Sequence, residues 1–243
     1  MLVYTQKNAM ANIVPNPWLS ISSLRHIAPC DEQYFIKCYG TVLNYEKWVN
    51  KIYPAASHTF SCLPDPFSGN PDSKVFCLNK NPGNPDPCFK NEPVFEAATI
   101  RNLQLLSPNC FWAETIPNKC GKLHEGVNWL RMRTKALETI LNRQPNIFFI
   151  EYYPYHSTKG FTFPIDLPSY EFSNMLIEQA MEQNKLIVIM REKTNWLKRI
   201  PSLEGYDYLA FLKCAQGGYL TPKNIIWAKT TKLLSNMDIK KFF

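Results

Sequence analysis

The residues of this chain best suited to chemistry stand in a short polar segment, Asn79–Asp86, with the sequence NKNPGNPD. The segment follows four apolar residues, 75–78, that predict a buried strand. Its two prolines and its glycine prevent both a helix and a continued strand, so we expect a stiff loop. Asn81 supplies a side-chain amide, and the carboxylate of Asp86 is the stronger base in the same loop. The alternative is a plain surface turn in which Asp86 is only solvated.

A second group of polar and aromatic residues follows another predicted strand. Residues 146–150, NIFFI, form an apolar run of strand type, and the sequence EYYPYHS comes next at 151–157. Histidine titrates near neutral pH and can protonate a departing group, although a lone histidine in a loop is more often structural. Aromatic rings can stack on a flat ligand, although each is more often part of a core. The side chains singled out here are Glu151, Tyr153, Tyr155 and His156, together with Phe89 just after the first loop.

The elements that must position these loops alternate along the chain. Apolar patterns predict strands over 75–78, 146–150, 186–190 and 208–212, and helices over 128–143, 169–184, around 196–199 and over 221–234. Ser169 and Thr221 are suitable N-caps for two of these helices. This alternation predicts a three-layer α/β/α fold around a central four-stranded parallel sheet. Because the carboxyl ends of parallel strands share one edge, the loops that follow them should converge there.

The remaining segments are less regular. Residues 1–60 contain two short helix patterns, one capped by Asp31 and one over 45–53, so we interpret them as an N-terminal helical elaboration packed on a core of residues 61–243. Residues 61–73 form an approach loop rich in proline, glycine and aspartate. Residues 84–127 show no clean periodicity, and so long an irregular stretch in a compact domain is more often functional than neutral.

Composition narrows the classes of function. Hydrophobic residues make up 45% and charged residues 19% of the chain, as in an ordinary globular protein, and the net charge of +7 weakly favours a polyanionic partner. The eight cysteines include no C-x-x-C pair and H-E-x-x-H does not occur, so we expect no zinc site, no iron–sulfur cluster and no cofactor. No run approaches 18 apolar residues and no leader opens the chain, which predicts no membrane partner and a cytosolic protein with free thiols, Cys77 being buried in its strand.

The order of these features resembles the uracil-DNA glycosylase superfamily. Its members begin the core with a strand that ends in a Gly-x-Asn-Pro-Gly or Gly-x-Asp-Pro type loop, and here residues 79–83 read NKNPG, with Asn79 where glycine is usual. The approach segment 64–71, PDPFSGNP, and the later YPYHS look like an uncharacterised bacterial branch of that superfamily. The resemblance covers roughly residues 61–235. At the last strand end, QGGY at 216–219 replaces the His-Pro-Ser-Pro or Asn-Pro-Ser pattern of the family.

The resemblance implies a DNA glycosylase, which takes one base out of the helix and hydrolyses its N-glycosidic bond to leave an abasic site. In this chain Asn81 takes the water-positioning place, Asp86 can share that role, and His156 can assist the departing base. The base would stack on the aromatic residues singled out above. DNA is the expected partner of a monomer, held at the last loop and at the N-terminus of the helix that follows it by Gln216, Gly217, Gly218, Tyr219 and Lys223.

The hypothesis about which base is removed depends on Glu151. In the uracil-excising relatives the second core strand ends in an asparagine that matches uracil, and Glu151 takes that place here. An ionised carboxylate offers only acceptors, which repel the carbonyl oxygen of uracil but accept from the exocyclic amine of cytosine. We therefore expect a modified cytosine, because removal of ordinary cytosine would destroy the host genome. The alternative for Glu151 is a pair with a nearby arginine or lysine.

Other functions stay open at this point. A uracil-type repair glycosylase and a DNA-binding module of the same fold that has lost the chemistry both fit the resemblance. An unrelated α/β enzyme, such as a nucleotide hydrolase, could use the Asn-Pro-Gly loop on phosphate. A P-loop nucleotidase is excluded, because G-x-x-x-x-G-K-[ST] does not occur. Repair of deaminated DNA and defence against phages with modified DNA are both compatible settings.

Overall fold

The computed structural model describes residues 14–54, 58–83, 92–109, 121, 123–158 and 166–243. They include a six-stranded sheet in the order β2-β4-β3-β6-β7-β8. Its edge strands, β2 (Phe67–Ser68) and β8 (Ile225–Trp227), are antiparallel to their neighbours. The four strands predicted from the sequence are confirmed. The two edge strands, β2 and β8, were not predicted and make the sheet wider than expected. The central strands are parallel and comprise β4 (Ile147–Ile150), β3 (Val75–Leu78), β6 (Leu186–Ile189) and β7 (Leu209–Leu212).

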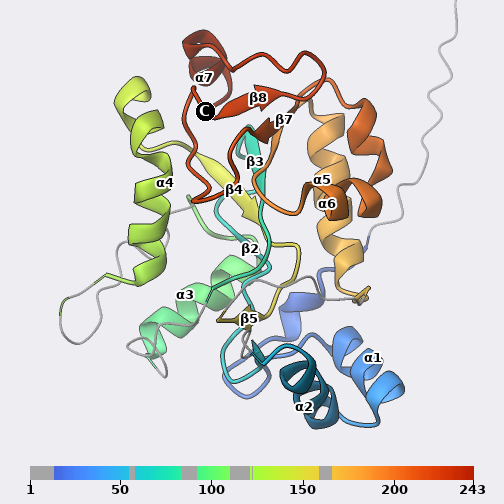
Figure 1. The fold of residues 1–243 in the computed structure, drawn as a ribbon. Coiled ribbons are helices and arrows are strands. Elements are labelled where there is room, and N and C mark those ends of the chain that lie inside the picture. Colours follow the sequence, from blue (N-terminus) through green and yellow to red (C-terminus); the bar gives the residue numbers. More distant parts are fainter. Residues whose placement is uncertain (1–13, 55–57, 84–91, 110–120, 122, 159–165) are drawn as a thin grey trace, which may run out of the picture.

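The alternation of side chains along each strand divides the core into two layers, one on each face of the sheet. In β3, Phe76 and Leu78 join one layer, and Val75 and Cys77 join the other. Because both faces are covered, every residue of β3, β4 and β6 is buried, including the predicted thiol of Cys77. Helices therefore lie on both sides of the sheet: α5 (Tyr170–Glu182) and α6 (Lys193–Arg199) on the first face, and α4 (Glu125–Leu141) and α7 (Asn236–Phe242) on the second (Figure 1).

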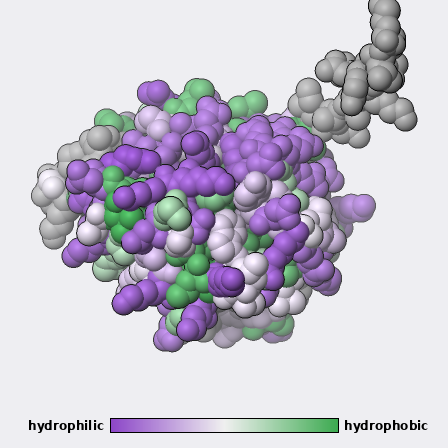
Figure 2. Space-filling model, turned by 90° about the horizontal axis from the view of Figure 1, so that it is seen from above, coloured by the Kyte–Doolittle hydropathy of each residue, from purple (hydrophilic) through white to green (hydrophobic). Residues whose placement is uncertain are grey.

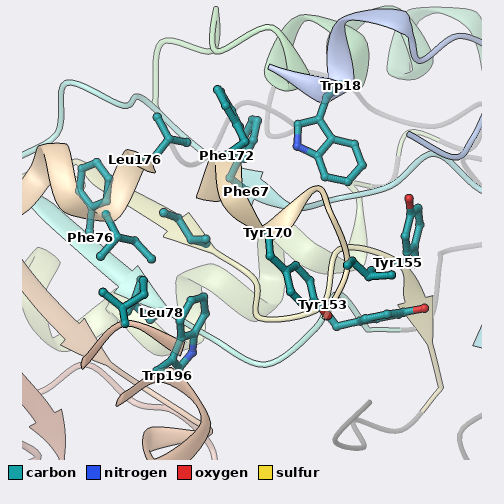
Figure 3. Close-up of a cluster of buried hydrophobic side chains, with 14 of the residues drawn as sticks. Trp18, Phe67, Phe76, Leu78, Tyr153, Tyr155, Tyr170, Phe172, Leu176 and Trp196 are labelled. Atoms are coloured by element: carbon teal, nitrogen blue, oxygen red, sulfur yellow. The ribbon is translucent and has the colours of Figure 1, made fainter. Parts of the chain in front are cut away.

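The segment before residue 61 contributes to the first of these core layers. Trp18 and Tyr155 meet edge to face with ring centroids 6.1 Å apart, and both belong to the same buried cluster as residues of β3 and β4 (Figure 3). The ring of Phe35 stacks on that of Tyr45 with centroids 4.1 Å apart. The elements of this segment are η1 (Pro17–Ser20), α1 (Pro29–Tyr39), α2 (Val42–Ile52) and β1 (His58–Thr59), which pairs with β5 (His156–Ser157).

Asp31 is not the helix cap that the sequence predicts. α1 begins at Pro29 with Ala28 before it, so Asp31 lies inside the first turn and is fully buried. Its carboxylate accepts hydrogen bonds from Ser169 N at 2.9 Å, from Ser169 Oγ at 2.7 Å and from the hydroxyl of Tyr155 at 2.7 Å. The hydroxyl of Ser169 is thus engaged with Asp31 instead of capping α5. This network joins the N-terminal helices to the core.

Two other predictions are wrong. The stretch 84–127, which lacks a clear period, contains α3 (Pro93–Leu103) and the start of α4. The helix predicted over 221–234 is absent: the carbonyl of Thr221 accepts from the backbone N of Asn224 at 2.9 Å and of Ile225 at 3.0 Å, a tight turn that leads directly into β8. Two isoleucines and a tryptophan favour a strand, and pairing with β7 outweighs the Thr-Pro helix-start signal.

A further 3-10 helix, η4, spans Pro201–Gly205.

Large exposed hydrophobic side chains of the described residues are spread along the chain, including Leu24 before α1 and Met237 in α7. The face seen in Figure 2 is mostly hydrophilic, with apolar residues in separate patches. Throughout the described ranges, no helix has both the length and the apolar character that a membrane crossing requires.

Candidate functional site

The loops that follow β3 and β4 meet at the carboxyl edge of the sheet. The parallel register pairs Leu78 with Ile150, so the next residue of each strand, Asn79 and Glu151, are also neighbours. The backbone N of Asn79 donates to Ile150 O at 2.8 Å, and its side-chain Nδ2 donates to Glu151 Oε1 at 3.0 Å. Asn79 is only 7% exposed. Two residues from loops far apart in sequence thus form one hydrogen-bonded pair, as the sheet topology predicts.

A third residue of this edge, Asp65, is not predicted from the sequence. It lies two positions before β2, where the chain continues antiparallel to the segment after β4. The backbone N of Glu151 donates to Pro66 O at 2.8 Å, and the backbone N of Asp65 donates to Pro154 O at 2.9 Å. Asp65 Oδ1 and Glu151 Oε2 are both buried and have no hydrogen-bond partner among the described residues. The Pro-Asp-Pro sequence marks a rigid approach, but only the edge pairing of β2 reveals that its carboxyl lies beside Glu151.

Burial makes both of these carboxyls hard to ionise. It raises the pKa of Asp65 to about 7. Burial also raises the pKa of Glu151 to about 8; the charge of Asp65 adds to this, while the Asn79 hydrogen bond and the charge of Arg191 oppose it. Near pH 7 Glu151 is therefore mainly protonated, which corrects the assumption of an acceptor-only carboxylate. Among the described residues Glu151 forms no ion pair, although the charge of Arg191 acts on it.

Asn81 is held so that its oxygen can accept. Its Nδ2 donates to Pro82 O at 2.7 Å and to Ser157 Oγ at 2.8 Å. Within the described part of the chain, Oδ1 of Asn81 has no hydrogen-bond partner. The preceding residue, Lys80, fixes the loop on its other side through an ion pair of 2.6 Å with Glu192. An amide whose two N–H groups are engaged can present only its oxygen to a water molecule.

His156 connects loops and is not free to act on a ligand in this arrangement. Its Nδ1 lies 2.8 Å from Gly83 O, and its Nε2 lies 3.0 Å from Leu63 O. Burial lowers the pKa of the imidazole, although both carbonyl contacts oppose this effect. Both ring nitrogens are thus occupied by backbone oxygens. The structural interpretation of His156 fits this geometry better than a role as an acid for the departing base.

The two tyrosines expected to stack on a base are in the core. Tyr153 and Tyr155 are each only 1% exposed, and their rings meet edge to face at 5.6 Å. The hydroxyl of Tyr153 lies 3.1 Å from that of Tyr45, and the hydroxyl of Tyr155 donates to Asp31. Their faces are therefore covered by protein. The other two predicted site residues of this region, Asp86 and Phe89, lie outside the described residues.

The loop after β7 also lies at the carboxyl edge of the sheet, and it is exposed. Gly217 and Gly218 have φ values of 81° and 65°, in the left-handed region that favours glycine. A Cβ on Gly217 would lie 2.5 Å from Cε2 of Tyr219, so the glycine lets this ring rest on the loop. The guanidinium of Arg133 lies over the rings of Tyr219 and Trp129, at 5.3 and 4.6 Å from the two centroids. Tyr219 remains 47% exposed.

Two further residues of this loop were predicted to contact DNA. Gln216 is exposed, as such a role requires. Lys223 is exposed too, but it stands in the turn before β8 and not at a helix N-terminus, which corrects that part of the prediction. Its place beside the end of β7 is fixed by the pairing of Leu212 with Ile225. Lys223 therefore lies on the same edge as the Asn79–Glu151 pair.

One surface hollow of about 370 Å³ lies away from this edge, between the N-terminal segment and the start of α5. Its lining is mainly apolar and includes Pro15, Pro17 and Phe172. The amide of Asn16, which also lines it, is already engaged with Leu103 O and Trp18 N. The hollow lacks the convergent polar groups of a catalytic site, so we place the candidate site at the strand ends.

No metal-binding group of three or more His, Cys, Asp or Glu occurs within the described ranges. Comparisons with protein-family models, with curated proteins and with solved structures found no match to this chain. The interpretation of the site therefore depends on the chemistry of its own residues: a fixed amide at Asn81, a hydrogen-bonded pair of Asn79 and Glu151, and a second buried carboxyl at Asp65.

Proposed function

We propose that this protein is a DNA glycosylase that flips a modified base of the cytosine type out of the duplex and hydrolyses its N-glycosidic bond. The observation that carries the proposal is Asn81. Both N–H groups of its amide are held by Pro82 O and Ser157 Oγ, so Oδ1 is oriented for a water molecule. This fixed amide lies at the carboxyl edge of the sheet, next in the loop to the Asn79–Glu151 pair.

The reaction requires little covalent chemistry from the protein. The glycosidic bond breaks through a cationic sugar, so an enzyme accelerates the reaction mainly by positioning water and stabilising charge. Oδ1 of Asn81 accepts a hydrogen bond from the water and aims its oxygen at the sugar carbon. An amide is a weak base, and the proton of the water therefore passes to a better one. Asp86 in the same loop remains our prediction for that acceptor.

Contacts with DNA come from the exposed loop after β7. Tyr219 is supported from below by Gly217 and flanked by Arg133, which suits a ring that enters the space left by a flipped base. Gln216 and Lys223, which precede and follow it in the sequence, are exposed, and Gly218 keeps the loop close to Met190 at the end of β6. The net charge of +7 supports association with a polyanion. A cytosine-type substrate must be modified, since removal of ordinary cytosine would damage the host, and phage genomes with modified bases supply such substrates.

The test uses matched duplexes that differ in one base: uracil, cytosine or a 5-substituted cytosine. After incubation with the full chain, alkali cleaves each abasic site, so strand scission reports base release. We expect release from a substituted cytosine. Asn81→Ala should lower the rate by a factor on the order of 100 to 1,000 while leaving DNA affinity unchanged.

Gln183→Ala is a matched control, because Gln183 carries an exposed amide after α5, towards the opposite edge of the sheet. This control should release the base at the wild-type rate. If no duplex loses its base but all bind, the chain is a DNA-binding module and the glycosylase proposal is wrong. A wild-type rate in Asn81→Ala would instead remove Asn81 from the mechanism and leave Asp86 as the residue to test.

A further inference from the structure

We propose that Asn79 and Glu151 together read the hydrogen-bonding edge of the flipped base, with Glu151 acting as a neutral acid that donates from Oε2 and Asn79 accepting through Oδ1. This inference rests on the proposed function and specifies how that site selects its substrate. It adds Asn79 as a specificity-determining residue and Asp65 as a positioning residue.

The orientation of the Asn79 amide follows from its partner. Nδ2 donates to Glu151 Oε1 at 3.0 Å, and this arrangement suits both the ionised and the neutral carboxyl, because Oε1 accepts in each case. Asn79 Oδ1 then has no partner among the described residues, and Glu151 Oε2 is buried without one. The hydrogen-bonded pair therefore offers two groups: an acceptor on Asn79 and, when Glu151 holds its proton on Oε2, a donor on Glu151.

Cytosine presents the complementary pattern. Its exocyclic amine donates, and the adjacent ring N3 accepts, so the amine meets Asn79 Oδ1 and N3 meets the Oε2 proton. Uracil presents the reverse order, a carbonyl oxygen beside an N–H, which would place acceptor against acceptor and donor against donor. Sites built to hydrogen-bond a substrate discriminate strongly against a partner that leaves their polar groups unpaired, by a factor on the order of 100 or more. Substituents at C5 of the base lie outside this contact.

Asp65 keeps the proton on Glu151. Its Oδ1 is buried without a partner, and backbone hydrogen bonds on both sides hold the two segments together. The charge of Asp65 favours the neutral form of Glu151, and the charge of Arg191 opposes it. The other charged groups nearby are already engaged: Lys80 pairs with Glu192, and both nitrogens of His156 contact carbonyl oxygens. The protonation of Glu151 is therefore set chiefly by burial and by Asp65.

The experiment measures base release against pH with the full chain. Wild-type release from the best cytosine derivative should fall above about pH 8, as Glu151 loses its proton. Glu151→Gln keeps one acceptor and one donor on the same frame, so it should retain release within about threefold and lose that alkaline fall. Asp65→Asn removes the neighbouring charge and should shift the fall to lower pH. Glu178→Gln, an exposed glutamate on α5, is the matched control and should leave the profile unchanged.

A direct readout that needs no turnover is the infrared C=O band of protonated carboxyls at pH 7, from which Glu151→Gln should remove one component. Each result has a distinct meaning. No release from any duplex overturns both the proposed function and this inference. Release from uracil in preference to every cytosine derivative overturns the inference and leaves the glycosylase standing. A loss of more than 100-fold in Glu151→Gln, or a pH profile that Asp65→Asn does not move, also overturns it.

Discussion

The molecule contains buried carboxyl groups in two places, at Asp31 and at the pair Asp65 and Glu151. The two places differ in how many hydrogen bonds the carboxyl oxygens accept. The carboxylate of Asp31 accepts three strong hydrogen bonds, from the backbone N and the hydroxyl of Ser169 and from the hydroxyl of Tyr155. Glu151 accepts one from Asn79, and its second oxygen, like one oxygen of Asp65, has no hydrogen-bond partner in the described part of the chain. A satisfied buried carboxylate stabilises a fold, whereas unsatisfied ones cost stability and are typical of ligand sites. The contrast separates a structural centre from the proposed site.

Removing the satisfied carboxylate should have the largest effect on stability. Asp31→Ala leaves the hydroxyl groups of Ser169 and Tyr155 and one backbone N–H without their acceptor inside the core. Each such group costs about 1–3 kcal/mol, so we expect the free energy of unfolding to fall by about 3–5 kcal/mol. Urea denaturation followed by fluorescence of the buried tryptophans measures this value.

Asp31→Asn is the informative companion, because its amide oxygen still accepts some of these bonds. It should cost less than the alanine variant. An Asp31→Ala protein with wild-type stability would show that the N-terminal helices are not joined to the core through this residue.

Asp65 and Glu151 should make the free energy of unfolding fall as the pH rises. An ordinary carboxylate in a salt bridge has the opposite effect. The pKa values of Asp65 and Glu151 are raised to about 7 and about 8, so between pH 5 and 8 the folded state binds more protons than the unfolded state. The stability that these two carboxyls contribute is greatest below the ordinary carboxyl pKa. It is lost as the pH rises through their pKa values in the folded state. We expect a loss on the order of 6 kcal/mol from pH 5 to 8.

The double variant Asp65→Asn, Glu151→Gln should remove the part of this slope that the pair contributes, while Glu178→Gln should keep the whole slope. Denaturation curves at several pH values measure the slope directly. A double variant that loses stability with pH as steeply as the wild type would contradict the assignment of the raised pKa values to this pair.

The core of the fold could be predicted from the sequence because it depends on local patterns. Short apolar runs bounded by prolines and polar residues mark β3, β4, β6 and β7 correctly, and strand ends on one edge bring Asn79 to Glu151. Asp65 could not be placed this way. Its position depends on β2, a strand of two residues whose pairing with β4 is a long-range contact with no local signal.

The errors have a similar physical cause. Asp31 carries a helix-capping signal, yet burial against Tyr155 and Ser169 decides its role. Tyr153 and Tyr155 follow a strand end and look like ligand contacts, but the N-terminal helices cover them. Thr221 and Pro222 match a helix start, and tertiary pairing of the next residues with β7 prevails. In each case a long-range partner outweighs a correct local preference.

Gly217→Ala should change stability less than the carboxyl variants do, and its effect should be confined to the exposed loop. The residue has φ 81°, and a Cβ would lie 2.5 Å from the ring of Tyr219, so the alanine must displace that ring. Strain of this kind costs about 1 kcal/mol. If Tyr219 enters DNA, the variant should weaken binding to a duplex severalfold without changing which base is released. Gly205→Ala, in η4 with open space around the added Cβ, is the control. Equal binding by both variants would remove Tyr219 from the interface.

The smallest expected effect concerns Lys223, which tests whether the exposed strand edge faces DNA at all. Its side chain is exposed in the turn before β8, on the edge where β7 ends. A lysine that contacts a phosphate contributes one unit to the dependence of log affinity on log salt and none to base selection. Lys223→Glu should therefore weaken binding to all sequences alike and reduce that slope by about 1.

Lys240 provides the matched control for this measurement. It is equally exposed but lies near the end of α7, where Phe242 packs on Tyr208 just before the start of β7, towards the opposite edge of the sheet. Lys240→Glu changes the net charge by the same amount, so it reproduces any effect of overall charge. If the two variants have the same salt slope, the carboxyl edge does not contact the phosphates, and the exposed Tyr219 must be explained without DNA. If only Lys223→Glu flattens the slope, the edge that holds the unsatisfied carboxyl pair is also the edge that meets the nucleic acid.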